Sequence, residues 1–280
     1  MSNLKNLIVV SDLHAGSQQG LCPDTVMLDG GGTYAASAQQ RVVMLAWREF
    51  WDVWVPRVTH GEPFAVVCNG DATDGRHHGS TEQVSQNLAD QGRIACELLA
   101  PVVEQCEGRF YLIRGTEAHV GPAAENEERL GEAIGALPDA DGRRSRYELW
   151  IKVGEGLVHL MHHIGTTGSM AYESTAVMRE LTDSYMEAGR NHRVPPDVVV
   201  RSHRHRYIEV RVPTIDGYGI SMVTPGWQLK TGFVYRLAGA RMSTPQIGGC
   251  IIRQGDEELH TRAYTRSIPL PEPEAIPCPE

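Results

Sequence analysis

The sequence predicts an α/β fold, in which a β-sheet carries helices on both of its faces. Short apolar runs alternate along the chain with longer segments of helical spacing, which is the pattern of strands and helices in turn. Continuous apolar runs of this length are typical of strands that are buried on both faces. The predicted strands are Leu7–Val10, Phe64–Cys68, Phe110–Ile113, Leu157–Met161 and Val198–Val200.

Three longer segments have the spacing of helices: Ala38–Val55, Glu82–Cys106 and Ala171–Ala188. Pro101 is expected to kink or end the second of them, because proline cannot donate a backbone hydrogen bond. In the first helix, most large apolar residues are expected near one side. These residues are Val42, Leu45, Trp47, Phe50, Trp51 and Trp54.

The C-terminal part of the chain predicts consecutive strands without long helices between them, and therefore an antiparallel closing section. These strands are Tyr207–Val212, Gly219–Thr224, Ile247–Arg253 and Leu259–Ala263. No linker divides the chain, so residues 1–267 are interpreted as one domain. Residues 268–280 contain five prolines and predict an extended, solvent-facing tail.

Composition excludes some classes of protein. The chain has 280 residues, 41% hydrophobic and 22% charged, which is typical of a globular protein. A net charge of −9 argues against a general nucleic-acid coat, although a local site could still bind phosphate. Six scattered cysteines without a CxxC pair indicate free thiols in a reducing compartment. Neither a signal-peptide core nor a run of about 20 apolar residues is present, so a cytoplasmic location without a membrane partner is expected.

Five clusters of Asp, His or Glu directly follow the five predicted strands. They are Asp12-Leu13-His14, Asn69 to Gly75, Gly115 to His119, His162-His163 and His203-Arg204-His205. Because ligands of an open α/β sheet bind beyond the carboxyl ends of its strands, all five clusters are expected to converge. The long loop Ala15–Ser37, which follows the first strand, is expected to cover a substrate there.

Carboxylate and imidazole groups together suit Mn, Fe or Zn. In an extended backbone, Asp12 and His14 would point the same way and reach one metal, whereas a turn could aim His203 and His205 at different ions. Each cluster alone has an ordinary explanation, since Asp and Asn also form helix caps and turns. Five clusters in this order favour a metal site.

The order of these motifs resembles the calcineurin-like metallophosphoesterase superfamily. The sequence has Asp-x-His, Gly-Asp-x-x-Asp, a Gly-Asn-His-like motif, His-His and a Gly-His-x-His-like motif, from Leu7 to about His205. The resemblance implies a four-layer αββα sandwich, with two mixed sheets flanked by helices. It also implies two divalent ions, of Mn, Fe, Zn or Ni, with Mn the ion expected to support activity in vitro.

The resemblance assigns the ligands of both ions. Metal one would take Asp12, His14, Asp71 and His205, and metal two would take Asp71 as a bridge, His203 and either His162 or His163, with His163 preferred. Thr116 stands where the family has an asparagine ligand, so metal two is expected to be weaker or to recruit water or Glu117. Ser202 replaces a glycine, a milder change.

The catalytic histidine of the family directly follows that asparagine, whereas here the nearest histidine is His119, which would be the general acid if its loop bulges. Asn69 and Asp74 are placed where they could hold the ligand histidines in one tautomer, or act as ordinary turn residues. His78 and Arg204 could contact the substrate. The variant motifs, together with Trp227 to Lys230, resemble the metallophosphoesterases of phages and prophages.

The function that the resemblance implies is hydrolysis of phosphoesters, with phosphodiesters of nucleic acid or nucleotides favoured as substrates. Two alternatives stay open: a phosphomonoesterase, and a metal-binding scaffold whose catalysis is weakened by the changed third motif. A metallo-hydrolase of another fold would normally show a His-x-His-x-Asp-His run, which the sequence does not contain. The oligomeric state is left open.

Overall fold

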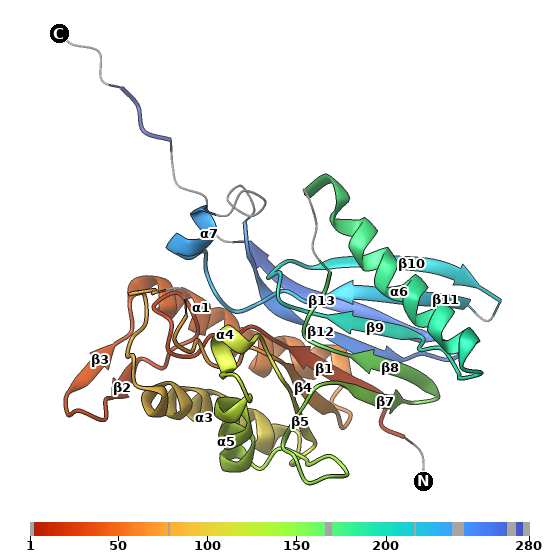
Figure 1. Ribbon diagram of the computed structural model, residues 1–280, viewed down its shortest axis with the longest axis horizontal. Coiled ribbons are helices and arrows are strands. Elements are labelled where there is room, and N and C mark those ends of the chain that lie inside the picture. The colour runs from red at the N-terminus through yellow and green to blue at the C-terminus, as the bar shows by residue number, and fades with distance from the viewer. Residues whose placement is uncertain are drawn as a thin grey trace.

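Two β-sheets that pack face to face form the centre of the computed structural model, which describes residues 3–77, 79–165, 170–215, 217–236, 244–267 and 273–276 (Figure 1). In spatial order, the first sheet contains β13 (Leu259–Ser267), β12 (Gln246–Gln254), β1 (Asn6–Val10), β4 (Ala65–Asn69), β5 (Phe110–Ile113) and β6 (Ser145–Arg146). The second contains β10 (Ile208–Thr214), β11 (Gly217–Val223), β9 (Val198–Arg201), β8 (Gly156–Leu160) and β7 (Leu149–Val153). All five strands predicted before residue 201 are confirmed, within one or two residues.

Both sheets are mixed. In the first sheet, β1, β4, β5 and β6 are parallel, and β12 pairs antiparallel with β1. In the second, β8, β9 and β11 are parallel, while β7 and β10 are antiparallel at the two edges. The predicted closing section is therefore only partly right. Its four strands form two antiparallel pairs, but β10 and β11 lie in one sheet and β12 and β13 in the other.

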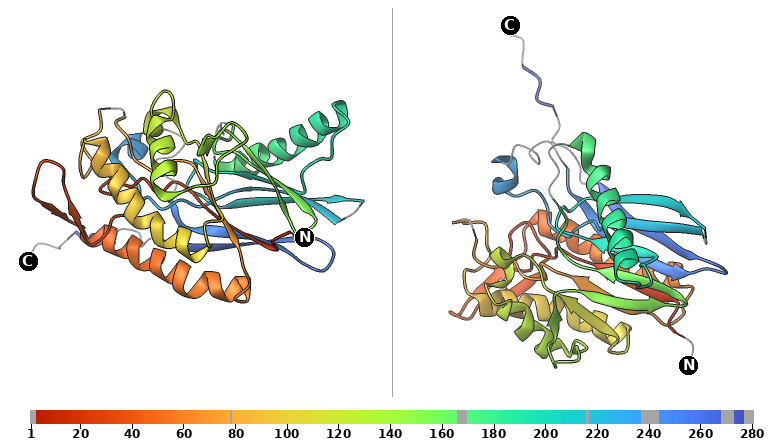
Figure 2. Two further views of the ribbon diagram at one scale, coloured as in Figure 1. Left: turned by 90° about the horizontal axis from the view of Figure 1, so that it is seen from below. Right: turned by 45° about the vertical axis from the view of Figure 1, so that its right-hand side comes forward.

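Helices cover the outer faces of the sandwich and complete four layers (Figure 2). On the first sheet lie α1 (Ala38–Glu49), a π-helix (Phe50–Trp54), α2 (Val55–Thr59), α3 (Leu88–Gln105) and α5 (Glu125–Ile134). The second sheet is covered by α6 (Glu173–Arg190), which contacts β9, β10 and β11. The described elements also include α4 (Glu117–Val120), α7 (Gly232–Arg236) and a 3-10 helix (Met170–Tyr172). The predicted α/β class and its αββα layering are confirmed.

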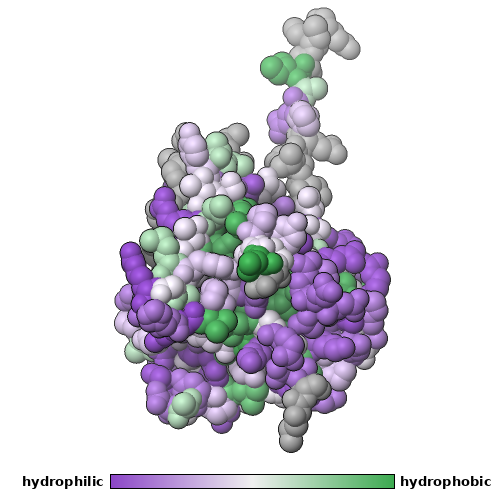
Figure 3. Space-filling model, turned by 90° about the vertical axis from the view of Figure 1, so that its right-hand side faces the viewer, coloured by the Kyte–Doolittle hydropathy of each residue, from purple (hydrophilic) through white to green (hydrophobic). Residues whose placement is uncertain are grey.

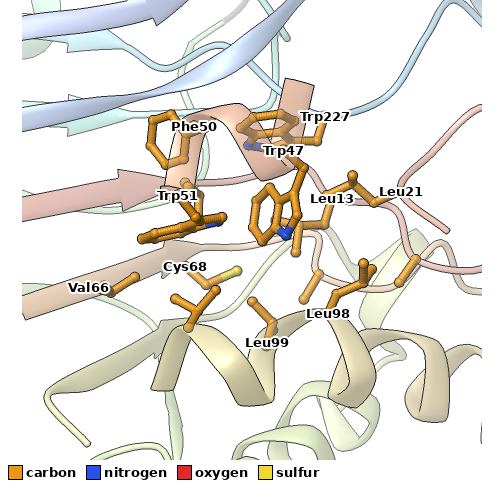
Figure 4. Packing of buried hydrophobic residues seen from close by; sticks show 14 of the residues in the cluster. Leu13, Leu21, Trp47, Phe50, Trp51, Val66, Cys68, Leu98, Leu99 and Trp227 are labelled. Carbon is orange, nitrogen blue, oxygen red and sulfur yellow. The ribbon is translucent and has the colours of Figure 1, made fainter. Parts of the chain in front are cut away.

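Two apolar cores hold the layers together, and β1 contributes to both because its side chains alternate between faces. Leu7 and Val9 point between the sheets, whereas Ile8 and Val10 point toward the helices. The core under the helices is rich in aromatic rings: Trp47 packs edge-on against both Trp51 and Trp227 (Figure 4). These cores fix the strands, and so the positions where their carboxyl ends meet.

The helix predictions need two corrections and one refinement. Val42 and Leu45 are 54% and 62% exposed, because they lie on the face of α1 away from Trp47. The helix α3 begins only at Leu88, where Asn87 accepts a hydrogen bond from the amide of Ala89. Of the two outcomes expected at Pro101, an end is excluded, because the proline lies inside α3, which continues to Gln105.

The loop Ala15–Ser37 is more ordered than its length suggests. It contains a hairpin of β2 (Thr25–Met27) and β3 (Thr33–Ala35), which projects beyond the helices in Figures 1 and 2. Its first part packs into the core, where Leu21 and Cys22 are fully buried. The tail predicted at residues 268–280 lies outside the described residues except for residues 273–276.

The surface at the end of the sandwich where the β10–β11 hairpin projects is mostly hydrophilic, and its apolar side chains lie in separate small areas (Figure 3). None of the helices among the described residues is long and apolar enough to cross a membrane. All five cysteines that the structure describes are free.

Candidate metal centre

The ends of five strands bring Asp and His side chains into groups that could each hold a metal ion. Within each group, one donor atom per residue lies within 4.8 Å of the others. The groups are Asp12, His14 and His205; Asp12, Asp71, His162 and His203; and His14, Asp74 and His119. The convergence expected at the carboxyl ends of the strands is therefore present, and it joins strands of both sheets.

In the first group, the three side chains face one another closely. Nε2 of His205 lies 3.2 Å from Oδ1 of Asp12 and 3.2 Å from Nε2 of His14. Asp12 and His14 are buried, whereas the side chain of His205 is 18% exposed. Among the described residues, Oδ1 of Asp12 has no well-aligned hydrogen-bond donor although it is buried. A buried carboxylate oxygen without a donor, facing two imidazole nitrogens, fits a cation.

The second group is centred on Asp71. Its Oδ2 lies 3.0 Å from Nε2 of His162 and 3.7 Å from Nδ1 of His203. Oγ1 of Thr116 lies in the same place, 3.2 Å from Oδ2 of Asp71 and 3.1 Å from Nδ1 of His203. The threonine thus occupies the position beside these donors that the sequence resemblance gives to an asparagine.

The histidines of the two motif pairs separate. His203 joins the Asp71 group and His205 joins the Asp12 group, as the possible turn between them allowed. Of the adjacent pair, the buried His162 faces Asp71, whereas His163 is exposed and belongs to none of the groups. The geometry therefore reverses the preference for His163. Its ring still lies near the site, with its centroid 5.6 Å from that of His203.

Five of the candidate ligands have a left-handed backbone. Their φ angles are 54° at Asp12, 46° at His14, 53° at Asp71, 73° at His203 and 52° at His205. A left-handed conformation costs an L-residue on the order of 1–2 kcal/mol, although Asp and His tolerate it better than most residues. The expectation that Asp12 and His14 point the same way because their backbone is extended is thus wrong. The two side chains face each other although both residues have a left-handed backbone. Strain of this kind concentrates at functional sites.

Glycines leave room for the site. A Cβ at Gly115 would overlap both the backbone nitrogen and Oδ1 of Asp71. At Gly70, φ is +90° and a Cβ would overlap the ring of His162. The two residues therefore allow the loops after β4, β5 and β8 to approach one another more closely than any side chain would permit.

Hydrogen bonds hold two of the candidate ligand histidines in one orientation. Nδ1 of His162 donates to the carbonyl of Asn69 over 2.7 Å, so Nε2 is left to face Asp71. Nδ1 of His14 lies 3.2 Å from Oδ1 of Asp74, and Nε2 is left to face His205. Asp74 supports His14 with its side chain, as suggested, whereas Asn69 supports His162 with its backbone carbonyl and its side chain donates to Met161 and Ser202. Partners of this kind set the tautomer of a metal-binding histidine.

Asp71 and His162 each change the pKa of the other. Burial alone would raise the pKa of Asp71. The adjacent His162 lowers this pKa by more than burial raises it, so the net pKa lies well below the ordinary value. Burial lowers the pKa of His162, and Asp71 outweighs this and raises it to about 10. The buried carboxylate thus requires a positive charge beside it, which a proton or a metal ion can provide.

His119 lies next to His14, with 4.6 Å between their ring centroids, and its Nδ1 donates to the carbonyl of Asp74. Burial lowers the pKa of His119 to about 4, and the neighbouring His14 lowers it as well. The imidazole is therefore neutral at pH 7, with Nε2 as its free nitrogen. With this low pKa it is a weak base, and it could donate a proton from Nε2 only if an adjacent negative charge first raised its pKa enough for Nε2 to bind that proton.

The remaining predicted residues belong to none of the three groups, or are not among the residues that the structure describes. His78 is not among the described residues. A guanidinium nitrogen of Arg204 donates to the carbonyl of Gly165. Glu117 begins α4 with an exposed side chain and belongs to none of the groups.

One buried residue was not predicted. Glu127, in the first turn of α5, is completely buried, and its carboxylate accepts hydrogen bonds from the amides of Ala72 and Gly115. Burial and the charge of Asp71 raise its pKa to about 8. The only signal in the sequence was an acidic helix start, which is ordinary helix chemistry.

A separate cleft of about 410 Å³ lies between α1, α3 and residues 23–25. None of the residues in the three groups lines it. The site is therefore marked by its converging donor atoms, and this cleft is not part of it.

The fold and these side chains define a four-layer α/β protein with groups that could hold two neighbouring metal ions. No protein-family model and no curated protein matches the chain. Among solved structures, it is similar to vacuolar protein sorting 29 from Cryptosporidium parvum, at 10% identity and a TM-score of 0.41, over 94% of this chain and 98% of that one. Sulfate thiohydrolase SoxB from Thermus thermophilus is similar at 12% identity and a TM-score of 0.41, over 95% of this chain and 57% of that one. Thermotoga maritima protein TM1076 is similar at 10% identity and a TM-score of 0.39, over 94% of this chain and 100% of that one.

Proposed function

We propose that this protein is a dinuclear metal-dependent phosphoesterase that hydrolyses phosphodiesters of nucleic acid or nucleotides. One observation carries the proposal: two adjoining groups of imidazoles, arranged around the buried carboxylates of Asp12 and Asp71, share Asp12 at the strand ends of both sheets. The motif order of the sequence, which resembles calcineurin-like metallophosphoesterases, supports the same conclusion.

The residues present fit two divalent ions. One ion would be held by Asp12, His14 and His205, and the other by His162 and His203. The resemblance implies that the carboxylate of Asp71 would serve both ions. Thr116 lies beside Asp71 and His203, in place of the amide ligand. Bound divalent ions would neutralise the charge of a phosphoryl group and make a water molecule acidic enough to deprotonate near neutral pH.

The chain's own residues would orient the reactants and move a proton. Asp74 and the carbonyl of Asn69 fix the rings of His14 and His162. His119 would give a proton to the leaving oxygen from Nε2. Its pKa of about 4 makes the neutral form dominant at pH 7, so the negative charge of a bound phosphodiester would have to raise that pKa.

The net charge of the protein favours a small phosphodiester over a nucleic acid that would need a large binding surface. The net charge of −9 opposes extensive contact with a polyanion, so recognition would be local to the metal centre. Arg206 is already paired with Glu173 at 3.3 Å, and Arg204 with a backbone carbonyl. Short nucleic-acid ends or nucleotides therefore suit this centre better than long duplexes. The resemblance to phage metallophosphoesterases supports the same substrate class.

The proposal is tested by assaying chelator-treated protein against bis-p-nitrophenyl phosphate and p-nitrophenyl phosphate, with and without Mn²⁺. Asp71→Asn removes the bridging charge and should lose turnover. Asp90→Asn is the matched control, because Asp90 is equally buried but is hydrogen-bonded to Ser85 and to the amide of Asp29, away from the groups. We expect Mn²⁺-dependent hydrolysis of the diester in the wild type and in Asp90→Asn only.

A scaffold function is the alternative that one feature favours, namely the replacement of an amide ligand by Thr116. Two bound ions without hydrolysis of either ester, under any divalent metal, would support it. Hydrolysis of the monoester alone would instead indicate a phosphatase. Failure to bind any metal would contradict both the enzyme and the metal scaffold.

A further inference from the structure

We propose that Glu127 is a positioning residue for the Asp71 side of the metal centre, and that it sets the separation of the two loops that carry Asp71 and Thr116. The inference rests on the proposed function, since it assumes that the group of Asp71, His162 and His203 holds an ion. Glu127 touches none of these donors itself, so its role would be exerted through the backbone.

The two oxygens of Glu127 are divided between two loops. Oε1 accepts from the amide of Ala72, which directly follows Asp71, over 3.2 Å. Oε2 accepts from the amide of Gly115, which directly precedes Thr116, over 2.8 Å. One carboxylate therefore links the loop after β4 to the loop after β5, next to a candidate ligand in each.

These loops have no space to adjust. The amide of Thr116 donates to Oδ1 of Asp71 over 2.6 Å, and Gly115 packs directly on Asp71, where even a methyl group would overlap. A shift of a few tenths of an ångström at Gly115 would therefore move the Asp71 carboxylate. Metal-binding geometry is sensitive to displacements of this size, and residues that orient the ligands typically affect metal affinity by 10–100-fold.

A carboxylate is the group that this position requires. Both loops present N–H donors, so the side chain must offer two acceptor atoms, as only Asp and Glu do with both oxygens. Glutamine would offer one acceptor and would turn an NH₂ group toward the other backbone N–H.

The next residue provides a natural comparison. Glu128 also accepts two backbone hydrogen bonds, from Arg144 over 2.6 Å and from Ser145 over 2.9 Å. It therefore links the same turn of α5 to the start of β6, and neither bond comes from the loops of Asp71 and Thr116. Glu127→Gln and Glu128→Gln make the same chemical change in the same helical turn, but only the first disturbs the loops of Asp71 and Thr116.

The test is a calorimetric titration of chelator-treated protein with Mn²⁺, combined with hydrogen exchange at the amides of Ala72 and Gly115. We expect Glu127→Gln to weaken one of two binding steps about tenfold and to leave the other within twofold. The weakened step should be the one that is missing in His203→Ala. In metal-free Glu127→Gln, the amides of Ala72 and Gly115 should exchange faster, whereas Glu128→Gln should leave these amides and both steps unchanged.

The results separate the two proposals. If the wild type binds no Mn²⁺, the proposed function fails, whatever the exchange data show. If the wild type binds two ions and Glu127→Gln binds both as tightly, or loses both equally, the positioning role is overturned. If Glu127→Gln does not fold, Glu127→Asp replaces it, because aspartate keeps both acceptor atoms on a shorter side chain. In Glu127→Asp, the Mn²⁺-binding step that is missing in His203→Ala should be weakened. No change in the affinity of that step would overturn the inference.

Discussion

Nδ1 of His14 lies 3.2 Å from Oδ1 of Asp74, and both side chains are almost completely buried. Burial raises the pKa of Asp74, but hydrogen bonds from His14 and His77 outweigh it, so the carboxylate stays ionised well below its ordinary range. Gln83 donates to the same carboxylate over 2.8 Å and Gln228 over 3.2 Å. His14 is thereby held with Nε2 toward Asp12 and His205, the arrangement that a metal ligand requires.

Asp74→Asn should therefore weaken the ion that Asp12, His14 and His205 would hold. The amide can present its NH₂ group to His14 and lose the preference for one tautomer, so we expect a loss of roughly 10–100-fold in affinity at that step. Mn²⁺ calorimetry measures it. Asp24→Asn, at an exposed carboxylate paired with Arg48, is the control. Weakening of the other step instead would contradict the assignment of His14.

Gly115→Ala should abolish binding of the second ion, because the added methyl group would collide with the backbone nitrogen of Asp71. Gly92→Ala is the matched control, since a Cβ there meets nothing within 4 Å inside helix α3. It should raise stability by up to about 1 kcal/mol, because alanine is the better helix former. Thermal melts and Mn²⁺ titrations of both variants check this, and normal binding in Gly115→Ala would show that the loops are not tightly packed.

Stability of the metal-free protein should depend on pH through Glu127. Its folded pKa is raised from 4.5 to about 8, so between these values the folded state binds the proton more tightly than the unfolded state. Its contribution is complete below about pH 4.5 and is lost as pH rises through about 8. The free energy of unfolding of the wild type, relative to Glu127→Gln, should therefore fall between pH 5 and pH 8 in urea titrations. If the free energies of unfolding of the two proteins changed with pH in parallel, Glu127 would not be a buried carboxyl group with a raised pKa.

His119→Gln should affect esters according to their leaving groups. Nitrophenolate leaves without a proton, so bis-p-nitrophenyl phosphate should lose less than about tenfold in kcat, whereas a dinucleotide, whose leaving group is an alkoxide, should lose about 10²–10⁴-fold. His260→Gln, at an exposed histidine of β13, should change neither rate. Equal losses for both esters would remove His119 from the role of general acid.

Much of the architecture could be predicted from the sequence because it depends on local patterns. The runs at Leu7–Val10 and Phe110–Ile113 are apolar on both faces, and each ends in a polar cluster, so both the strand and the position of its carboxyl end can be recognised. The sorting of the last four strands between two sheets could not be predicted in this way, because it depends on packing between distant segments.

The site is less predictable because its details depend on backbone geometry. Whether His162 or His163 faces inward is decided by the hydrogen bond from His162 to the carbonyl of Asn69, 93 residues away along the chain. The left-handed conformations of Asp12 and His14 could not be predicted, because Asp and His tolerate this conformation but adopt extended and helical backbones as well. Glu127 lies in an acidic helix start, and its contacts with the loops after β4 and β5 arise only when α5 packs against them.

Anomalous diffraction from crystals of the protein soaked in Mn²⁺, with data collected on both sides of the manganese absorption edge, would locate the bound ions themselves. We expect two anomalous peaks separated by about 4 Å, as in two-metal phosphoesterases. One should lie among Asp12, His14 and His205, and the other among Asp71, His162 and His203. No peak at these residues, under conditions in which Mn²⁺ is in excess, would contradict the proposed metal centre.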